Sequence, residues 1–281
     1  MFICLDQVFW RRGTSDSLNL SWKNVALLLN GPSLEKHRTE LNTRNFDHIA
    51  VTNAFATTDM FTEIKPDLYF LQDPFWFDEK QSSAKSAATL EAIQQDLEWC
   101  MELFVPIKYE DSKVVQELKE NPLLTIRSMQ IQNRYAFMDF LSPGIPLAML
   151  SRPFQRLISR LIANGWLLVP SHGIASSALF VLIMSKASRV DIYGLDMSMG
   201  KDLVVTSDGN VKLNPTHFYS KIESGIRPIA GTGSTMAANY QAVAKKFEVM
   251  YLLEQVAHFM GCKVINHSHE TLLDAFKEGD N

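Results

Sequence analysis

Cysteine is scarce in this chain, which has only Cys4, Cys100 and Cys262 among 281 residues. An odd number at wide spacing supports neither a disulfide framework nor a zinc site of the paired-cysteine type, and it favours a reducing cytoplasm. A large excess of positive charge is also absent, because 27 basic residues stand against 31 acidic ones and the formal net charge is −4. A nucleic-acid-binding protein would carry a broad basic surface. We therefore expect no nucleic acid as a partner.

Long apolar runs are missing as well. The longest, ALFVLIM at 178–184, falls far short of the ~20 residues that cross a bilayer. The first residues place apolar side chains before the basic ones, the reverse of a secretory signal. We expect a cytoplasmic protein without a membrane span. Trp10, Arg11 and Arg12 form the segment that would make a peripheral contact with the inner membrane.

Several well-known catalytic motifs do not occur. The chain has neither G-x-G-x-x-G nor a Walker lysine, which excludes the usual dinucleotide and P-loop sites. It also lacks D-x-D, H-E-x-x-H and G-x-S-x-G. His267 and His269 have no carboxylate cluster beside them and indicate a polar loop. We expect neither a metal ion nor a cofactor.

Short apolar segments that alternate with helical patterns dominate the remainder. The predicted strands are 25–29, 48–52, 67–71, 190–193 and 263–266, and the predicted helices are 80–99, 147–163, 174–185 and 234–260. Continuous apolar strands separated by helices are typical of a parallel sheet. We therefore predict the α/β class: a Rossmann-like, mostly parallel sheet with flanking helices and a small lid subdomain.

The predicted organisation is an N-terminal extension over 1–23 and one α/β domain over 24–275. Between the predicted helices, 105–146 reads as irregular because it holds four prolines. The stretch 197–232 is poor in helical pattern, and its Asp208-Gly209 is a turn signal between two short strands. A connection of this length is commonly functional. We predict that 197–232 forms a lid.

A tight turn, Asn30-Gly31-Pro32-Ser33, follows the first predicted strand and opens a helix. Free N–H groups at such a turn, together with the positive end of the helix, suit a phosphate. An ordinary strand-to-helix turn would have the same residues, and the sequence leaves both interpretations open.

Other predicted strands also end in polar residues. Asn53 follows the second strand and Asp73 the third, where a doubly wound sheet binds its ligand. Gly194 and Asp196 follow the strand at 190–193, and Asp196 is placed either to cap a helix or to contact a ligand. An asparagine amide can pair with a nucleobase or a ribose, although asparagine at a strand end is also a common turn former. The occurrence of polar residues at the ends of several predicted strands favours a ligand-binding site at this edge of the sheet.

Two further segments contain candidate residues. Ser171, His172 and Gly173 precede the buried helix, with Ser171 a natural N-cap and His172 best interpreted as structural. His217 lies in the long polar loop, where an imidazole can take a proton from a substrate hydroxyl. Most histidines in surface loops have no such role, so both interpretations remain.

The order of these segments resembles the bacterial lipooligosaccharide sialyltransferases of glycosyltransferase family 42. That family has N-G-P-S-L, an asparagine after the second strand, Ser-Gly before the central helix, S-G-I-D, and a late Ser-His-Tyr. The N-G-P-S-L turn also occurs in a related group of 6-hydroxymethylpterin pyrophosphokinases and motility accessory factors. The resemblance covers about residues 24–275 and implies a nucleotide-sugar-binding domain.

Carried over by position, the resemblance implies a CMP-sugar site and an inverting, metal-independent transfer of a sialic acid-like sugar. The implied donor contacts are Asn30, Gly31, Ser33, Asn53, Asp73, Ser171, Gly173, Gly194 and Asp196, and the implied general base is His217. The implied partners are a nucleotide sugar and a glycan or glycolipid acceptor of lipopolysaccharide assembly. The oligomeric state stays open, and a homo-oligomer is one expectation.

The chain departs from the family in two places. The family's two tyrosines after S-G-I-D, which contact the leaving phosphate, are missing here, and Lys201 or Tyr219 would have to replace them. Asp73 stands where the family has asparagine. Two alternatives follow: a pyrophosphokinase-like enzyme that uses ATP and magnesium, if Asp73, Asp78 and Asp196 converge, or a nucleotide-sugar-binding protein without turnover.

Overall fold

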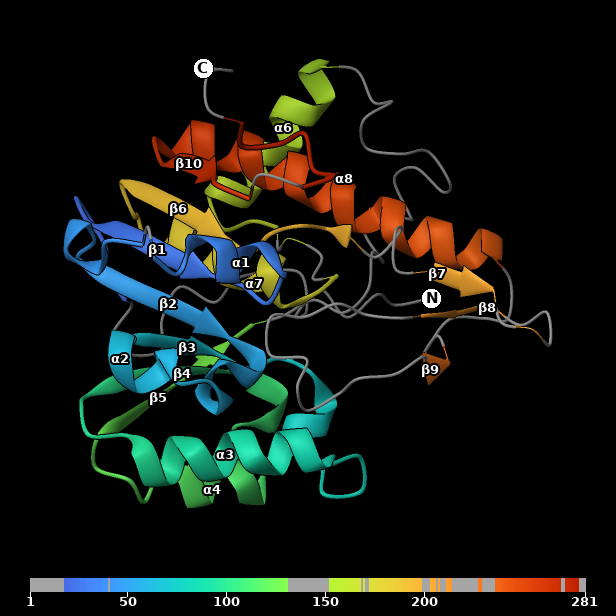
Figure 1. Cartoon of the computed structure of the whole chain (residues 1–281). Helices are drawn as coiled ribbons and strands as arrows, with labels where there is room; N and C mark the ends of the chain where they lie inside the picture. The colour runs from blue at the N-terminus through green and yellow to red at the C-terminus, as the bar shows by residue number, and fades with distance from the viewer. Residues whose placement is uncertain are drawn as a thin grey trace, which may run out of the picture.

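The computed structural model describes residues 18–39, 41–130, 152–167, 169, 172–198, 203–205, 207, 211–213, 227–228, 236–268 and 271–277. Its centre is a seven-stranded sheet in the order β10-β6-β1-β2-β3-β4-β5 (Figure 1). Every neighbouring pair in this sheet is parallel. Helices flank the sheet, which confirms the predicted α/β class.

The strands of the large sheet are β1 (Asn24–Leu28), β2 (His48–Thr52), β3 (Leu68–Phe70), β4 (Met101–Pro106), β5 (Leu124–Met129), β6 (Arg189–Tyr193) and β10 (Lys263–Asn266). The helices are α1 (Ser33–His37), α2 (Met60–Ile64), α3 (Ala84–Asp96), α4 (Lys113–Leu118), α6 (Arg152–Ala163), α7 (Ile174–Met184) and α8 (Met236–Met260). Short 3₁₀ turns are η2 (Thr43–Asn45), η3 (Asn53–Thr57), η4 (Pro74–Trp76) and η5 (Ile107–Tyr109). All five predicted strands and all four predicted helices are therefore present.

The prediction of irregular structure from residue 105 onward was wrong for its described part. β4, α4 and β5 lie between Met101 and Met129, where they extend the sheet at one edge. β5 pairs along its length with β4, from Met101↔Leu124 to Pro106↔Met129. Its exposed Thr125 and partly exposed Arg127 break the apolar pattern. An edge strand needs fewer apolar residues, which is why composition did not reveal it.

Two apolar layers hold the sheet between its helices. Val25 and Leu27 of β1 belong to the core shared with α7 and α8. Ala26 and Leu28 point to the opposite core, which includes residues of η3, α2 and α3. This alternation follows from the period of two along a strand. Among the described helices, none is both long and apolar enough to cross a membrane.

A second, small sheet lies in the segment predicted as a lid. β7 (Leu203–Val205) and β8 (Val211–Leu213) pair antiparallel, and β9 (Arg227–Pro228) pairs with β8. The two strands expected on either side of Asp208-Gly209 are thus confirmed, although the turn itself lies outside the described residues. Figure 1 shows β7 and β8 beside the N-terminal end of α8. A lid function for 197–232 remains a prediction.

One polar cluster is built into β6. The Asp191 carboxylate accepts hydrogen bonds from Arg189 Nε at 2.6 Å and Nη2 at 2.7 Å, and from His267 Nε2 at 2.5 Å. The His267 ring stacks on Tyr193 with centroids 4.8 Å apart. Burial alone would raise the pKa of Asp191, but the bonds from His267 and Arg189 outweigh it and hold the pKa below its usual value.

This cluster predicts a stability effect in acid. A carboxyl whose pKa is lowered by folding stabilises the protein above its unfolded pKa of about 3.9, and that contribution is lost as pH falls through the folded value. Asp191→Asn should therefore lower the free energy of unfolding at pH 7 by about 1–2 kcal/mol and flatten its decline below about pH 4. Urea unfolding over a pH series measures both. A variant with the wild-type acid profile would contradict this account.

Candidate active site

The strand order of the large sheet reverses its direction at β1. From β1 the chain proceeds outward through β2, β3, β4 and β5, then returns to β6 on the other side of β1. Ligands of open parallel sheets bind at such a reversal point, outside the carboxyl ends of the strands. The loops after β6, β1, β2 and β3 are consecutive neighbours along this edge. The predicted polar strand ends therefore meet on one side of the sheet.

The turn after β1 is tied to the loop after β6. Gly31 N donates to Gly194 O at 2.9 Å, and Ser33 N donates to Asp196 Oδ2 at 2.9 Å. The Ser33 hydroxyl donates to the second oxygen of Asp196, and the two residues are only 4% and 5% exposed. Asp196 thus occupies the positive end of α1, as an anion does at a helix N-terminus.

This arrangement corrects the interpretation that the turn after β1 offers the N–H of Ser33 to a phosphate. The N–H of Ser33 does not face outward to a phosphate, because the Asp196 carboxylate has taken that position. The two interpretations left open for Asp196 are therefore resolved in part, since it binds the start of α1. Ser33 and Asp196 as contacts of a nucleotide stay predictions.

Both glycines are required by the close approach of these two loops. A Cβ on Gly31 would lie 2.3 Å from Asp196 Oδ2 and 2.5 Å from Gly194 O. Gly194 has φ +75°, and a Cβ there would lie 2.6 Å from Leu29 O. The sequence indicated close backbone approach at Gly194. The described partner of that approach is the neighbouring loop of the same chain.

The asparagines after β1 and β2 face different environments. Thr52 Oγ1 donates to Asn30 Oδ1 at 3.4 Å. Asn53 adopts φ +54°, a left-handed conformation that asparagine tolerates better than most residues. Tyr69 Oη donates to Asn53 O, which fixes the backbone there. The side-chain Oδ1 of Asn53 is buried and, among the residues that the structure describes, has no hydrogen-bond partner. An unpaired buried acceptor of this kind is a candidate ligand contact.

Asp73, at the carboxyl end of β3, lies in a positive field. Burial raises the pKa of its carboxyl, while the charges of Lys246, Lys85 and Lys108 act in the opposite direction. Burial also lowers the pKa of Lys246, and the Asp73 charge partly offsets it. The three lysines come from α8, α3 and η5, so the fold gathers them from distant parts of the sequence. Such a group can receive a phosphate or a carboxylate.

These lysines are the candidate site residues that the sequence did not reveal. Lys246 sits in the interior of a 25-residue helix, next to Lys245 and without a motif around it. Its position follows from topology, because α8 precedes the parallel strand β10 and so begins at the carboxyl edge of the sheet. Only the strand order indicates that this helix begins at the carboxyl edge of the sheet.

The remaining predicted site residues are only partly described. Gly173 has an extended conformation with φ +155° and ψ +165°, and it occupies the N-cap position of α7 that Ser171 was expected to fill. Ser176 Oγ donates to Gly173 O at 2.8 Å. Four predicted site residues lie outside the described residues: Ser171, Lys201, His217 and Tyr219.

The carboxylates proposed for a magnesium site do not come together. Asp196 binds Ser33, whereas Asp78 accepts from Gln81 Nε2 at 2.7 Å within its own turn. Among the described residues, no group of three or more histidine, cysteine, aspartate or glutamate side chains could hold a metal ion.

Comparison with known proteins gave matches to solved structures alone. No family model matches the chain, and no curated protein sequence matches it. The sialyltransferase CstII from Campylobacter jejuni with cytidine-5'-monophosphate is 15% identical, with a TM-score of 0.44 over 92% of this chain and 84% of that chain. CstII in complex with CMP-3FNeuAc is also 15% identical, with a TM-score of 0.41 over 91% of this chain and 85% of that chain. CST-II in complex with a trisaccharide acceptor and CMP is 16% identical, with a TM-score of 0.42 over 91% of this chain and 85% of that chain. The alignments span most of both chains at low identity.

The contact between the two loops predicts coupling between Gly31 and Asp196. Gly31→Ala should lower the free energy of unfolding by about 1–3 kcal/mol, because the new Cβ meets atoms that cannot all move away. The same substitution should cost less in an Asp196→Ala background, where the carboxylate is gone. Urea unfolding of the four proteins measures the coupling. Strictly additive effects would show that the two side chains do not meet.

Proposed function

We propose that this protein is a CMP-sugar-dependent glycosyltransferase that transfers a sialic acid-like sugar to a cell-surface glycan or glycolipid. The observation that carries the proposal is the presence, at the carboxyl edge of β2 and β3, of a buried Asn53 acceptor without a partner among the described residues and of the Asp73 carboxyl, on which the charges of three lysines act. The N-G-P-S-L turn and the order of the later segments support the same donor class.

The two halves of this edge match the two ends of CMP. The cytosine amino group is a hydrogen-bond donor, and the Asn53 Oδ1 acceptor complements it. The lysines complement the phosphate and the sugar carboxylate. Lys246 would in addition stabilise charge on the departing CMP, a role for which the chain lacks the family's tyrosines. Lys201 and Tyr219 are further candidates for that role.

The proposed reaction is an inverting displacement without a metal or cofactor. The acceptor hydroxyl oxygen forms a bond to the anomeric carbon, and its proton passes to His217. The bond from the anomeric carbon to the phosphate oxygen breaks, and CMP leaves with the electron pair. Because that carbon develops oxocarbenium character, negative side chains near it would also assist. A neutral imidazole is needed to accept the proton.

The alternative of an ATP- and magnesium-dependent pyrophosphokinase has less support. It needs carboxylates that share a cation, and Asp73, Asp78 and Asp196 each have different neighbours. A nucleotide-sugar-binding protein without turnover would differ from the proposed enzyme only in its lack of sugar transfer, so an activity assay separates the two.

Lys246 provides a test of the donor site. Lys246→Gln removes the positive charge beside Asp73 and should weaken CMP binding by about ten-fold or more, the size of one charge-assisted contact. Lys245→Gln, its neighbour on α8, is the matched control and should change affinity by less than about two-fold. Isothermal titration in EDTA measures both. Equal affinities in the two variants would remove Lys246 from the site.

His217 provides a test of catalysis. His217→Ala should cut turnover by ~10²–10⁴-fold and leave CMP affinity nearly unchanged, because the proton is transferred only in the transition state. The acidic limb of the pH–rate profile should disappear with it. Sugar transfer from CMP-sialic acid to an oligosaccharide gives the rates. Wild-type turnover in the variant would make His217 an ordinary loop residue. In a separate measurement, a loss of activity in EDTA that magnesium reverses would favour the pyrophosphokinase.

A further inference from the structure

Helix α6 has one face buried against the protein and one face exposed. Ile158 and Ile162 are buried in the core shared with α8, and Ser159 Oγ donates to Gln255 Oε1 at 3.2 Å. On the outer face Arg152, Arg156 and Arg160 are exposed at a spacing of four residues. Residues at this spacing lie above one another on a helix. The three guanidinium groups thus form one row.

Exposed apolar side chains accompany the row. Leu157 is 50% exposed, Trp166 57% and Phe259 of α8 47%. Trp166 N donates to Leu161 O at 2.8 Å, which holds the backbone of Trp166 close to the end of α6. The Arg160 guanidinium carbon lies 5.7 Å from the centre of the Phe259 ring. We call Arg152, Arg156, Leu157, Arg160, Trp166 and Phe259 the arginine–aromatic surface.

The arginines of this surface differ from three other described arginines. Arg38, Arg127 and Arg189 each contact a carboxylate at 3.1 Å or less. Within the described ranges, none of the three α6 arginines forms an ion pair with a carboxylate. The whole chain is nevertheless acidic, with a formal charge of −4. Positive charge is therefore concentrated locally and available to a partner.

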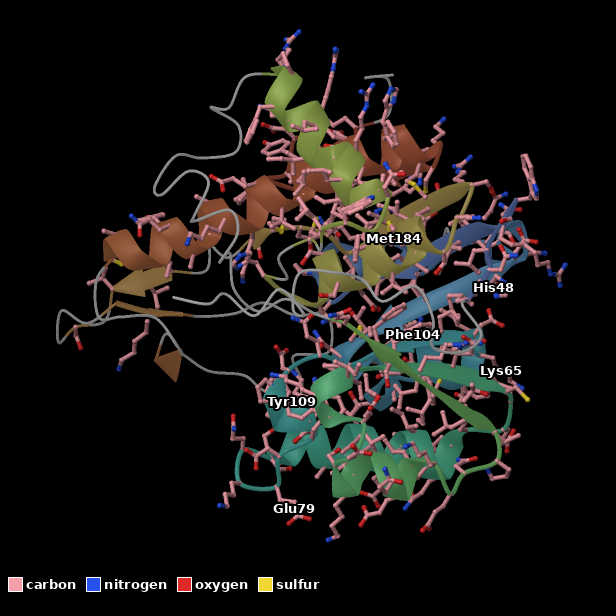
Figure 2. All side chains as sticks on the ribbon, turned by 180° about the vertical axis from the view of Figure 1, so that it is seen from behind. His48, Lys65, Glu79, Phe104, Tyr109 and Met184 are labelled. Atoms are coloured by element: carbon pink, nitrogen blue, oxygen red, sulfur yellow. The ribbon has the colours of Figure 1, made fainter. Side chains whose placement is uncertain are left out.

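We propose that the arginine–aromatic surface docks on the anionic headgroups of a lipid bilayer. Arginines one helical turn apart reach separate headgroups, and tryptophan and phenylalanine are suited to the depth of the headgroup layer. The apolar face of α6 is already used against α8, so the helix lies on the bilayer through its charged face and does not insert. Figure 2 shows nitrogen-tipped side chains projecting outward from α6, at the opposite end of the molecule from α3 and α4.

This inference does not rest on the proposed enzyme activity, because binding to lipid requires no turnover. It also differs from the expectation for Trp10, Arg11 and Arg12, which lie outside the described residues. The two segments can be separated by experiment.

The test is sedimentation of the full chain with phosphatidylcholine vesicles, with and without phosphatidylglycerol. Each basic side chain at an anionic surface contributes about five-fold in partitioning, so Arg152→Gln/Arg156→Gln/Arg160→Gln should weaken binding to the anionic vesicles by about 100-fold. High salt should likewise weaken the binding of the wild-type protein to the anionic vesicles. Trp166→Ala should weaken binding in a way that salt does not change, because it removes apolar contact.

The matched control is Lys80→Gln/Lys113→Gln/Lys119→Gln, which removes the same charge around α3 and α4 and should bind as the wild type does. Circular dichroism verifies that each variant is folded. The proposal is overturned by no binding of the wild type to anionic vesicles, by equal binding of the α6 variant, or by loss of binding confined to Arg11→Gln/Arg12→Gln. If the wild type is a dimer and the α6 variant is a monomer, the surface binds a second copy of the chain, and the proposal is also overturned.

Discussion

The contact between Ser33 and the Asp196 carboxylate organises the carboxyl edge of the sheet. It joins the loops after β1 and β6 at the point where the direction of the chain reverses. A bound anion at this point would compete with Asp196 for the same N–H and hydroxyl. Gly31 and Gly194 are a consequence, because any side chain there would separate the loops. Further along the edge lie the buried Asn53 Oδ1, which has no hydrogen-bond partner among the described residues, and the Asp73 carboxyl, on which the charges of three lysines act.

The sequence predicted five of the seven strands of the large sheet, and four of these, β1, β2, β3 and β6, are interior strands. The interior strand β4 was missed, although most of its residues are buried. The run at 25–29 is apolar throughout, the run at 190–193 is apolar apart from the buried Asp191, and tertiary context cannot easily override such patterns. β5 was missed because an edge strand tolerates exposed residues such as Thr125. The motif residues Asn30, Asn53, Asp73 and Gly194 were correctly placed on one edge, since parallel strands end together.

Local pattern could not predict which groups at that edge pair with each other. Asp196 follows β6, 163 residues after Ser33, and no spacing rule connects the two. Lys246 is equally hidden, because a lysine within a long helix is ordinarily solvated. Its location depends on the direction of α8, which is fixed when β10 joins the sheet in parallel beside β6. Long-range order thus supplies the charge of the candidate site, and short-range pattern supplies its loops.

Helix α8 links the candidate active site to the arginine–aromatic surface. Lys246 lies in its first half and Phe259 near its end, and 13 residues at 1.5 Å each separate them by roughly 20 Å. A single straight helix is a rigid spacer. With Phe259 at a bilayer, Lys246 would be held at about this height at most, the reach depending on the tilt of the helix. The helix would thus set an upper limit on the distance between the bilayer and Lys246, and with it on the length that a lipid-attached acceptor has to span.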